Sequence, residues 1–404
     1  MRVLPGMIGL LVFLAAPSAL RSASAGPGPR LEWEWHAPQT EIQDLAFSNQ
    51  GSELAASVNY LWPDGVDAES YPQAFLAALS ERAQREPRFA DPKVMILSKA
   101  GVVDTLPGWG WSPAFSPDDA KVAFSSQVQP ATGKRILAAT LAGNELALYD
   151  RSSHAVEKLV SPLPDEHVGR SVFTEDGKGL FYEIGAAVNG EWQGAIGVGW
   201  VALPGAKEAV LVEPKKVLGY WVVVDGLSAM AGGVFADLWV PAHKGPEDYL
   251  ADRYDEHFVK IGADGRQTEL MAASRSIEER ETLLASAGPA GGFSVAKNGQ
   301  LDRYDPAGQL QGSQKMHERE SLVAQSYRAG WLAFLVGERF EQGGQAIVFR
   351  SLDGKMKYKL RVPGDFDEMV PSGDGKKIAM VDTRDVDKNG EHSQYDCVSI
   401  FDID

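Results

Sequence analysis

A short motif recurs four times along the chain, and this repetition restricts the folds that the chain can adopt. The copies lie at 46–57, 114–125, 172–183 and 370–381. Each copy ends one apolar segment, places Ser or Thr before a polar turn with Asp or Gly, and begins a second apolar segment. Such turns join antiparallel strands, because Gly and Asp tolerate positive φ and the hydroxyl can bond the turn backbone. The repeat therefore predicts four hairpins of one design.

A second kind of hairpin recurs between these turns. Its members lie at 94–103, 146–160, 198–212, 258–265, 301–308, 347–355 and 398–402. Two hairpins per unit make four strands, which is the composition of a propeller blade, and propellers usually have roughly four to eight blades. The sequence therefore predicts an all-β fold, a seven-bladed β-propeller, with six blades as the alternative.

The seventh of these hairpins has no return strand, since the sequence ends at Asp404. A candidate for the missing strand lies near the other end of the chain, where 31–36 (LEWEWH) alternates apolar and charged residues. This alternation is typical of a half-buried strand. Pairing it with 398–402 would close the ring and remove two exposed strand edges. We therefore expect the N-terminal strand to complete the C-terminal blade.

The blade motif is clearest at 115–119 (FSPDD) and 121–125 (KVAFS), and 173–180 and 372–380 repeat it less perfectly. This motif resembles the WD-like blade repeat of TolB-like β-propellers. It describes the fold and says little about chemistry. The resemblance implies a protein or peptide partner that binds on one face of the ring.

Residues 1–25 have the features of a secretory signal peptide. Arg2 gives a positive start, 7–16 (MIGLLVFLAA) is a short apolar run, and small residues precede the cleavage expected after Ala25. The alternative is an uncleaved anchor, although the apolar run is shorter than the ~20 residues of a spanning helix. We expect 26–404 to be a single exported domain without a transmembrane segment, located in the periplasm or outside the cell.

The chain is acidic and almost free of cysteine. Its 55 Asp and Glu residues against 39 Lys and Arg residues give a formal net charge of −16. An acidic surface repels nucleic-acid phosphates, so we expect no nucleic-acid partner. A single cysteine, Cys397, excludes an intrachain disulfide. Its apolar neighbours predict a buried, unreactive thiol.

Insertions interrupt the regular spacing of the hairpins. Ser70 and Pro87 bound a segment whose apolar residues have helical spacing, which predicts a helix between them. Shorter helical segments are expected around 246–253 and 276–279, the latter with a blade connector as the alternative. Such rim insertions either carry recognition or cap apolar surface.

The segment 385–396 (DVDKNGEHSQYD) matches the calcium-loop template at its first, third, fifth and sixth positions. Ca²⁺ prefers oxygen ligands, so Asp385, Asp387, Asn389 and Asp396 would bind it through side chains and Glu391 through its backbone carbonyl. Asp396 replaces the usual glutamate and is one methylene shorter. The sequence thus predicts either a calcium site that stiffens the last blade or a metal-free polar hairpin loop.

No catalytic motif is recognisable in the sequence. It has no Gly-x-Ser-x-Gly elbow and no zinc-binding His-Glu-x-x-His spacing. The predicted innermost strands carry four charged residues, Asp44, Arg170, Asp225 and Glu368, which would line a central channel. We therefore expect a non-catalytic recognition or scaffold module of the cell envelope or extracellular space. The alternatives are a propeller enzyme (a lyase, lactonase or glycan hydrolase) with its site in this channel and a structural module stabilised by calcium.

Aromatic residues near the expected channel add a hypothesis about the ligand. Trp109 and Trp111 flank the start of the second blade, and Tyr220 and Trp221 occupy a similar place in the fourth. Such side chains can stack on sugars or peptides. Ordinary packing between blades is the alternative interpretation.

Overall fold

The computed structural model describes residues 28–403 apart from several gaps. The gaps are 38–39, 61–92, 128–143, 162, 164–165, 189–190, 205–207, 218–219, 231, 245–250, 277–285, 288–291, 298, 318–319, 338–344 and 389–390. The described residues form strands and turns and include no helix.

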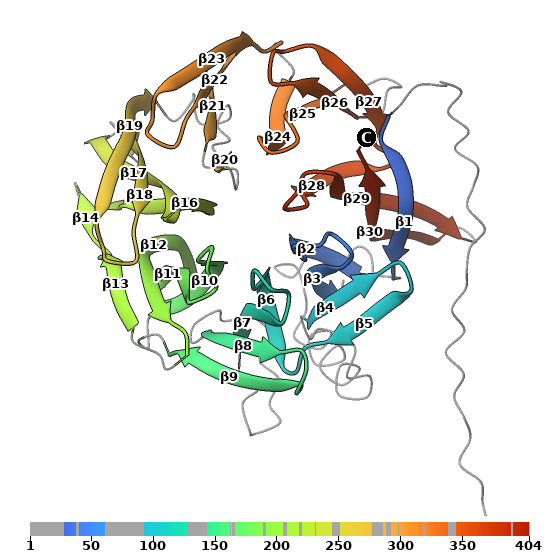
Figure 1. Cartoon of the computed structure of the whole chain (residues 1–404), viewed down its shortest axis with the longest axis horizontal. Coiled ribbons are helices and arrows are strands. Elements are labelled where there is room, and N and C mark those ends of the chain that lie inside the picture. The colour runs from blue at the N-terminus through green and yellow to red at the C-terminus, as the bar shows by residue number, and fades with distance from the viewer. Residues whose placement is uncertain are drawn as a thin grey trace, which may run out of the picture.

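Seven four-stranded antiparallel sheets stand as blades around a common axis (Figure 1). Blade 1 contains β2 (Thr40–Phe47), β3 (Leu54–Tyr60), β4 (Lys93–Ser98) and β5 (Gly101–Thr105). Blade 2 contains β6 (Trp109–Phe115), β7 (Lys121–Gln127), β8 (Glu145–Asp150) and β9 (Ala155–Val160). Blade 3 contains β10 (Glu166–Phe173), β11 (Gly179–Val188), β12 (Glu191–Ala202) and β13 (Glu208–Val212). The first strand of each blade lies nearest the axis.

The remaining blades follow the same order. Blade 4 contains β16 (Val223–Met230), β17 (Gly233–Lys244), β18 (Ala251–Ile261) and β19 (Gln267–Ser276). Blade 5 contains β20 (Ser286–Ala287), β21 (Phe293–Lys297), β22 (Gln300–Tyr304) and β23 (Leu310–Lys315). Blade 6 contains β24 (Glu320–Ser326), β25 (Trp331–Val336), β26 (Ala346–Ser351) and β27 (Met356–Arg361). Blade 7 contains β28 (Asp365–Pro371), β29 (Lys377–Lys388), β30 (Glu391–Asp402) and β1 (Arg30–His36). The seven-bladed propeller predicted from the sequence is confirmed.

Strand β1 closes the ring as the outermost strand of blade 7. It pairs antiparallel with β30, with Trp33 opposite Ile400 and Trp35 opposite Val398. An ion pair of 2.6 Å between Lys377 Nζ and Glu32 Oε2 supports this joint. The predicted closure by the N-terminal strand is therefore confirmed.

The recurring turns owe their shape to the hydroxyl residue that the repeat contains. Ser372 Oγ donates a hydrogen bond of 2.8 Å to Asp374 and accepts one of 3.0 Å from the Lys377 amide. Ser116 and Thr174 make the same pair of contacts in their blades. The hydroxyl thereby fixes the turn and the register of the two strands that it joins.

The apolar core lies between neighbouring blades. Ile42 of blade 1 packs against Ala379 and Val398 of blade 7, and all three are almost completely buried. On the other side of blade 1, Ile96 packs against Phe124 of blade 2. Because each blade buries both faces of its sheet, the core continues around the ring.

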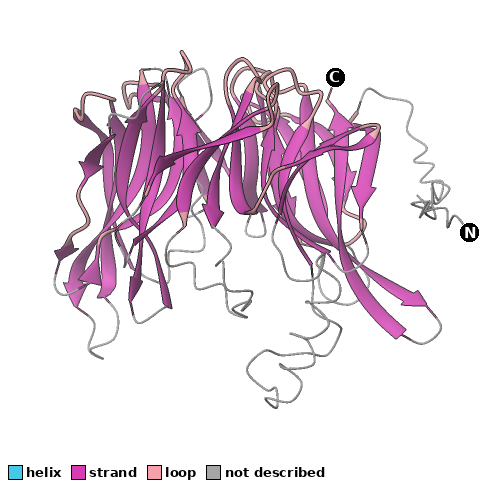
Figure 2. Ribbon diagram, turned by 90° about the horizontal axis from the view of Figure 1, so that it is seen from below, coloured by secondary structure: helices cyan, strands magenta, loops and turns pink. Residues whose placement is uncertain are grey.

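The two faces of the ring differ in their connections. Where the connections are described, tight turns join the first strand of a blade to the second and, in blades other than blade 7, the third to the fourth; Figure 2 shows turns along one face. Second and third strands are joined at the opposite face, where β29 and β30 remain paired as far as Lys388 and Glu391. This pair projects from the ring in Figure 2.

The helical insertions expected from the sequence have a mixed outcome. The segment bounded by Ser70 and Pro87 lies outside the described residues. In the expected helix at 246–253, the described residues 251–253 begin β18 and pair with β17, so that prediction is wrong there because sheet pairing prevails over local preference. Ser276 ends β19, and 277–279 are not described. Within the described chain, no helix is long and apolar enough to cross a membrane.

Candidate functional site

The innermost strands share an irregularity in their pairing. Pairing between the first and second strands shifts register in six blades, at corresponding places. The residues at these bulges are Asp44, Ser112 and Pro113, Gly169 and Arg170, Asp225, Val323, and Asp367. Bulges often lie beside functional sites, because the unpaired residue turns away from the ladder. No spacing in the sequence indicates these bulges.

Two of these residues have an unusual backbone conformation. Asp44 and Ser112 each have a φ of 49°, which is rare for residues other than glycine. Ser112 Oγ donates a hydrogen bond of 2.9 Å to Asp44 Oδ2, and the Ser112 amide donates one of 3.0 Å to Ser57 Oγ. Each such conformation costs on the order of 1–3 kcal/mol and persists where the surroundings hold it. The fold therefore holds Asp44 and Ser112 together although their backbone conformations are unfavourable in free energy.

Arg170 lies at the centre of an acidic cluster. Burial alone would lower its pKa, but Glu183, Asp44, Glu368 and Asp225 raise it, in that order of strength. The guanidinium group forms an ion pair with Asp44, with 3.7 Å between Arg170 Nε and Asp44 Oδ1. The four channel residues predicted from the sequence are thus brought together from β2, β10, β16 and β28. Four carboxyl groups thus act electrostatically on one guanidinium group, whose side chain is 61% exposed.

Glu183 is the member of this cluster that sequence reasoning missed. It lies on β11, the second strand of its blade, and is 7% exposed. The Arg170 amide donates a hydrogen bond of 3.1 Å to Glu183 Oε2. A Cβ atom at Gly169 would lie 2.7 Å from the same oxygen, so a side chain there would displace the carboxylate from this position. A lone acidic residue in the apolar segment 180–184, opposite a glycine, was the available signal.

Burial, and after it the neighbouring carboxyl groups, raise the pKa of two members of the cluster. For Glu183, burial is the main cause and Asp44 and Asp225 add to it, so its pKa rises to about 7 although Arg170 opposes the change. For Glu368, burial followed by Asp44 raises the pKa to about 7. Both groups hold their protons more tightly than ordinary glutamates, which is how crowded carboxylates respond to each other. An added cation would relieve this repulsion.

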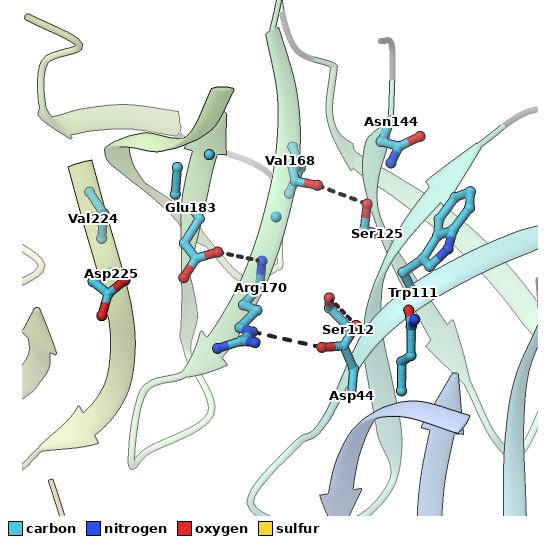
Figure 3. A pocket seen from close by; sticks show the side chains of 14 residues that line it. Asp44, Trp111, Ser112, Ser125, Asn144, Val168, Arg170, Glu183, Val224 and Asp225 are labelled. Carbon is cyan, nitrogen blue, oxygen red and sulfur yellow. Dashed lines mark hydrogen bonds and ion pairs between the residues drawn. The ribbon is translucent and has the colours of Figure 1, made fainter. Parts of the chain in front are cut away.

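A cavity of about 520 Å³ adjoins the cluster. Figure 3 shows Glu183 and Asp225 on one side, Arg170, Asp44 and Ser112 between, and the ring of Trp111 with Asn144 and Ser125 on the other side. This volume is within the range of ligand pockets, roughly 300–1,000 Å³. The cavity therefore combines acidic groups, one guanidinium group and one aromatic face.

A second acidic pair is buried in blade 4. Asp237 and Glu256 are 5% and 1% exposed. Burial and then the neighbouring Glu256 strongly raise the pKa of Asp237, and Asp225 also contributes. Asp237 therefore retains its proton at neutral pH, and the pair adds less negative charge to the site than its composition suggests.

The aromatic residues expected near the channel separate into two groups. Trp111 lines the cavity, whereas Trp109 is 6% exposed and packs as a core residue. Tyr220 and Trp221 form β15 (Tyr220–Trp221), which pairs with β14 (Lys216–Val217) in a small extra hairpin before blade 4. Lys216 Nζ lies 4.6 Å from the centre of the Trp221 ring. Of the residues whose side chains are described, only Trp111 is placed to stack on a ligand of the cavity.

The predicted calcium segment belongs to the projecting pair of β29 and β30. Asp385 pairs with Gln394 and Asp387 with His392, so both aspartates lie on one arm of a hairpin. The side chains of Asp387 and Glu391 and all of Asn389 lie outside the described residues. Calcium binding by this segment therefore stays a prediction.

Asp396, the last predicted ligand, has a structural role that the sequence did not indicate. Its side chain is buried, with Oδ2 accepting a hydrogen bond of 2.7 Å from the Ile42 amide and Oδ1 accepting one of 2.8 Å from Thr383 Oγ1. Asp396 thus links blade 7 to blade 1. Among the described residues, no three His, Cys, Asp or Glu side chains converge closely enough to hold a metal ion.

The single cysteine is placed as the sequence predicted. Cys397 is fully buried in β30, and burial is the main cause that raises the pKa of its thiol to about 12. A thiol with so high a pKa is protonated at neutral pH and is a poor nucleophile.

Comparison with known proteins identifies the fold. No family model matches the chain, and no curated protein matches it in sequence. Among solved structures, an oligogalacturonate lyase in complex with manganese matches with a TM-score of 0.52 and 12% identity over 91% of this chain and 92% of that chain. A prolyl endopeptidase matches with a TM-score of 0.53 and 14% identity over 89% of this chain and 50% of that one. At these identities the likeness shows a β-propeller and nothing more specific.

Proposed function

We propose that this chain is a non-catalytic recognition propeller, of TolB-like type, that binds a positively charged group of a protein or peptide in the central cavity. The observation that carries the proposal is the cluster around Arg170, where carboxyl groups from four blades outnumber the one cation. Crowded carboxylates in a partly enclosed site attract cations more strongly than the same groups in water.

The charge of the whole molecule supports a cationic rather than an anionic ligand. With a formal net charge of −16, the chain attracts basic partners over long range. An anionic ligand would meet the guanidinium group of Arg170 but also the carboxyl groups of Asp44, Glu183 and Asp225, which line the cavity. An oligogalacturonate, which the similar lyase is named for, is itself polyanionic and is disfavoured here for the same reason.

We also propose that the protein acts outside the cytoplasm, in the periplasm or the extracellular space. The signal-like features of residues 1–25 support this placement. Cell fractionation tests it: the protein should be recovered in the periplasm or medium with a mature N-terminus at residue 26. Recovery in the cytoplasm with residues 1–25 retained would contradict the proposal.

The binding proposal is tested with peptides of equal length and opposite charge. We expect calorimetry to detect binding of a basic peptide and none of its acidic counterpart, with affinity falling as salt rises. Asp44→Asn and Asp225→Asn should each weaken binding of the basic peptide at least about tenfold, since each removes one carboxylate from the cavity. Asn tolerates the positive φ of Asp44, so the first variant keeps the backbone.

A matched control is Glu157→Gln, which removes one negative charge from an exposed position on β9, the outermost strand of blade 2. It should leave affinity nearly unchanged. Equal losses in the control and the cavity variants would mean that net charge, not the cluster, attracts the peptide. Tighter binding of the acidic peptide would overturn the proposal.

A second candidate function is favoured by the pKa values of Glu183 and Glu368. Groups with a pKa of about 7 can both donate and accept protons at neutral pH, as acid–base catalysis requires. A screen with lyase and hydrolase substrates tests this candidate. Turnover that disappears in Glu183→Gln and persists in Glu157→Gln would favour an enzyme over a recognition module.

A further inference from the structure

The side of the cavity away from the carboxylates has its own chemistry. This wall consists of Trp111, Ser125, Asn144 and Val168, and is called the Trp111 wall below. Ser125 Oγ donates a hydrogen bond of 2.8 Å to the Val168 carbonyl, so this hydroxyl group already has a hydrogen-bond partner within the protein. The ring of Trp111 is partly exposed and gives the wall an aromatic surface.

Asn144 differs from its neighbours in the wall. It is 3% exposed, and its Oδ1 has no hydrogen-bond partner among the described residues. A buried amide oxygen without a partner costs roughly 1–3 kcal/mol, so most are paired by protein, water or ligand. A half-turn of the amide exchanges the places of its oxygen and nitrogen, so the oxygen can face the cavity while the nitrogen takes its buried place. Asn144 thus supplies an acceptor that a donor group of a ligand can complete.

The cavity as a whole therefore presents acceptors in several directions beside one aromatic face. A guanidinium group fits this arrangement better than an ammonium group does. It is flat, carries five N–H donors spread around its edge, stacks on tryptophan and is weakly hydrated. An ammonium group has three donors at one point and loses more hydration on entering the cavity. Arg170 already forms an ion pair with Asp44, although its side chain is 61% exposed, so a carboxylate of the cavity does attract a guanidinium group.

We propose that the cation recognised in the cavity is the guanidinium group of an arginine side chain on the partner, stacked on Trp111 and donating hydrogen bonds to Asn144 and to Asp44 or Asp225. The inference rests on the proposed recognition of a cationic protein or peptide and specifies its chemistry. It makes Trp111 and Asn144 the residues that select arginine over lysine.

Peptides that differ in one side chain provide the test. Acetylated and amidated glycine peptides carrying a single arginine, lysine or citrulline are titrated into the full protein by calorimetry, so that the side chain is the only cation. A fourth peptide, glycine-only and amidated with a free amino terminus, tests a terminal ammonium group. We expect the arginine peptide to bind about tenfold more tightly than the lysine peptide, and the citrulline and glycine-only peptides to bind still more weakly.

Variants of the Trp111 wall separate selection from stability. Trp111→Leu should reduce affinity for the arginine peptide about tenfold and largely remove the preference over lysine, whereas Trp111→Phe should retain part of it. Trp221→Leu, on the extra hairpin before blade 4, is the matched control. It should change neither the affinity for the arginine peptide nor the preference for arginine over lysine. Asn144→Leu should weaken arginine binding without lowering the melting temperature, since it removes an unpaired buried oxygen.

The possible results have distinct meanings. If arginine and lysine peptides bind equally and Trp111→Leu weakens both alike, arginine selection is overturned while cation recognition stands. If Trp111→Leu has no more effect than Trp221→Leu, the role of the wall is overturned. If none of the cationic peptides binds, the proposed function fails as well.

Discussion

Glu183 provides a prediction that links the acidic cluster to stability. Because burial and neighbouring carboxylates raise its pKa from an ordinary value of 4.5 to about 7, the folded protein prefers the protonated carboxyl group. The unfolded chain has no such preference and releases the proton near pH 4.5. Folding is therefore favoured at low pH, and this contribution is lost as pH rises from about 4.5 through about 7 and then stays constant.

The magnitude follows from the two pKa values. For a single proton, a difference of one pKa unit between the folded and unfolded states is worth about 1.4 kcal/mol. With the two pKa values of Glu183, the free energy of unfolding falls by about 2.5 kcal/mol between pH 5 and pH 8. Glu183→Gln keeps an oxygen that can accept the Arg170 amide but has no charge to titrate. The variant should therefore gain about 2.5 kcal/mol relative to the wild type as pH rises from 5 to 8.

Urea unfolding at pH 5, 6, 7 and 8 measures this difference for wild type and variant. Subtracting the two curves removes the titration of other groups, Glu368 included. The free energy of unfolding of Glu157→Gln, a variant in an exposed position, should change with pH as that of the wild type does. A stability difference between Glu183→Gln and wild type that stays within about 0.5 kcal/mol from pH 5 to pH 8 would refute the assigned protonation of Glu183.

Two further predictions concern the last blade. Trp35→Ala should lower the free energy of unfolding, measured with urea, by about 2 kcal/mol, because the half-buried ring packs against the core shared by blades 7 and 1. Unchanged stability would contradict the role of β1 in closing the ring. If the segment 385–396 binds calcium, a chelator should lower the melting temperature and added Ca²⁺ should restore it. In Asp387→Asn the chelator should no longer change the melting temperature. A wild-type melting temperature that the chelator does not change would refute the site.

The sequence predicted the fold well because its signals were local. The hydroxyl-containing turn is built from contacts within six residues, such as Ser372 with Asp374 and Lys377, so it can be recognised without knowledge of the rest of the molecule. Ring closure was predictable because the alternation in 31–36 supplied the strand that the last hairpin lacked. The start of β18 was not predictable, because its conformation depends on pairing with β17.

The candidate site was only partly predictable, because it depends on contacts between blades. Asp44, Arg170, Asp225 and Glu368 could be placed on innermost strands from the blade spacing, and the structure gathers them. Glu183 could not, because it lies on a second strand and reaches Arg170 only where Gly169 has no side chain.

The bulges explain how one fold can hold such a cluster without weakening its sheets. In an unbroken strand every residue contributes to the ladder or to the packing between blades, so a charged residue there disturbs the fold. At a bulge one residue is released from the ladder of strand pairing. Asp44 and Asp225 occupy such positions, whereas blade 6 has Val323 at the corresponding place. Substitution of Asp225 should therefore change ligand binding far more than stability, which is the behaviour expected of a site built on positions that the propeller does not need for folding.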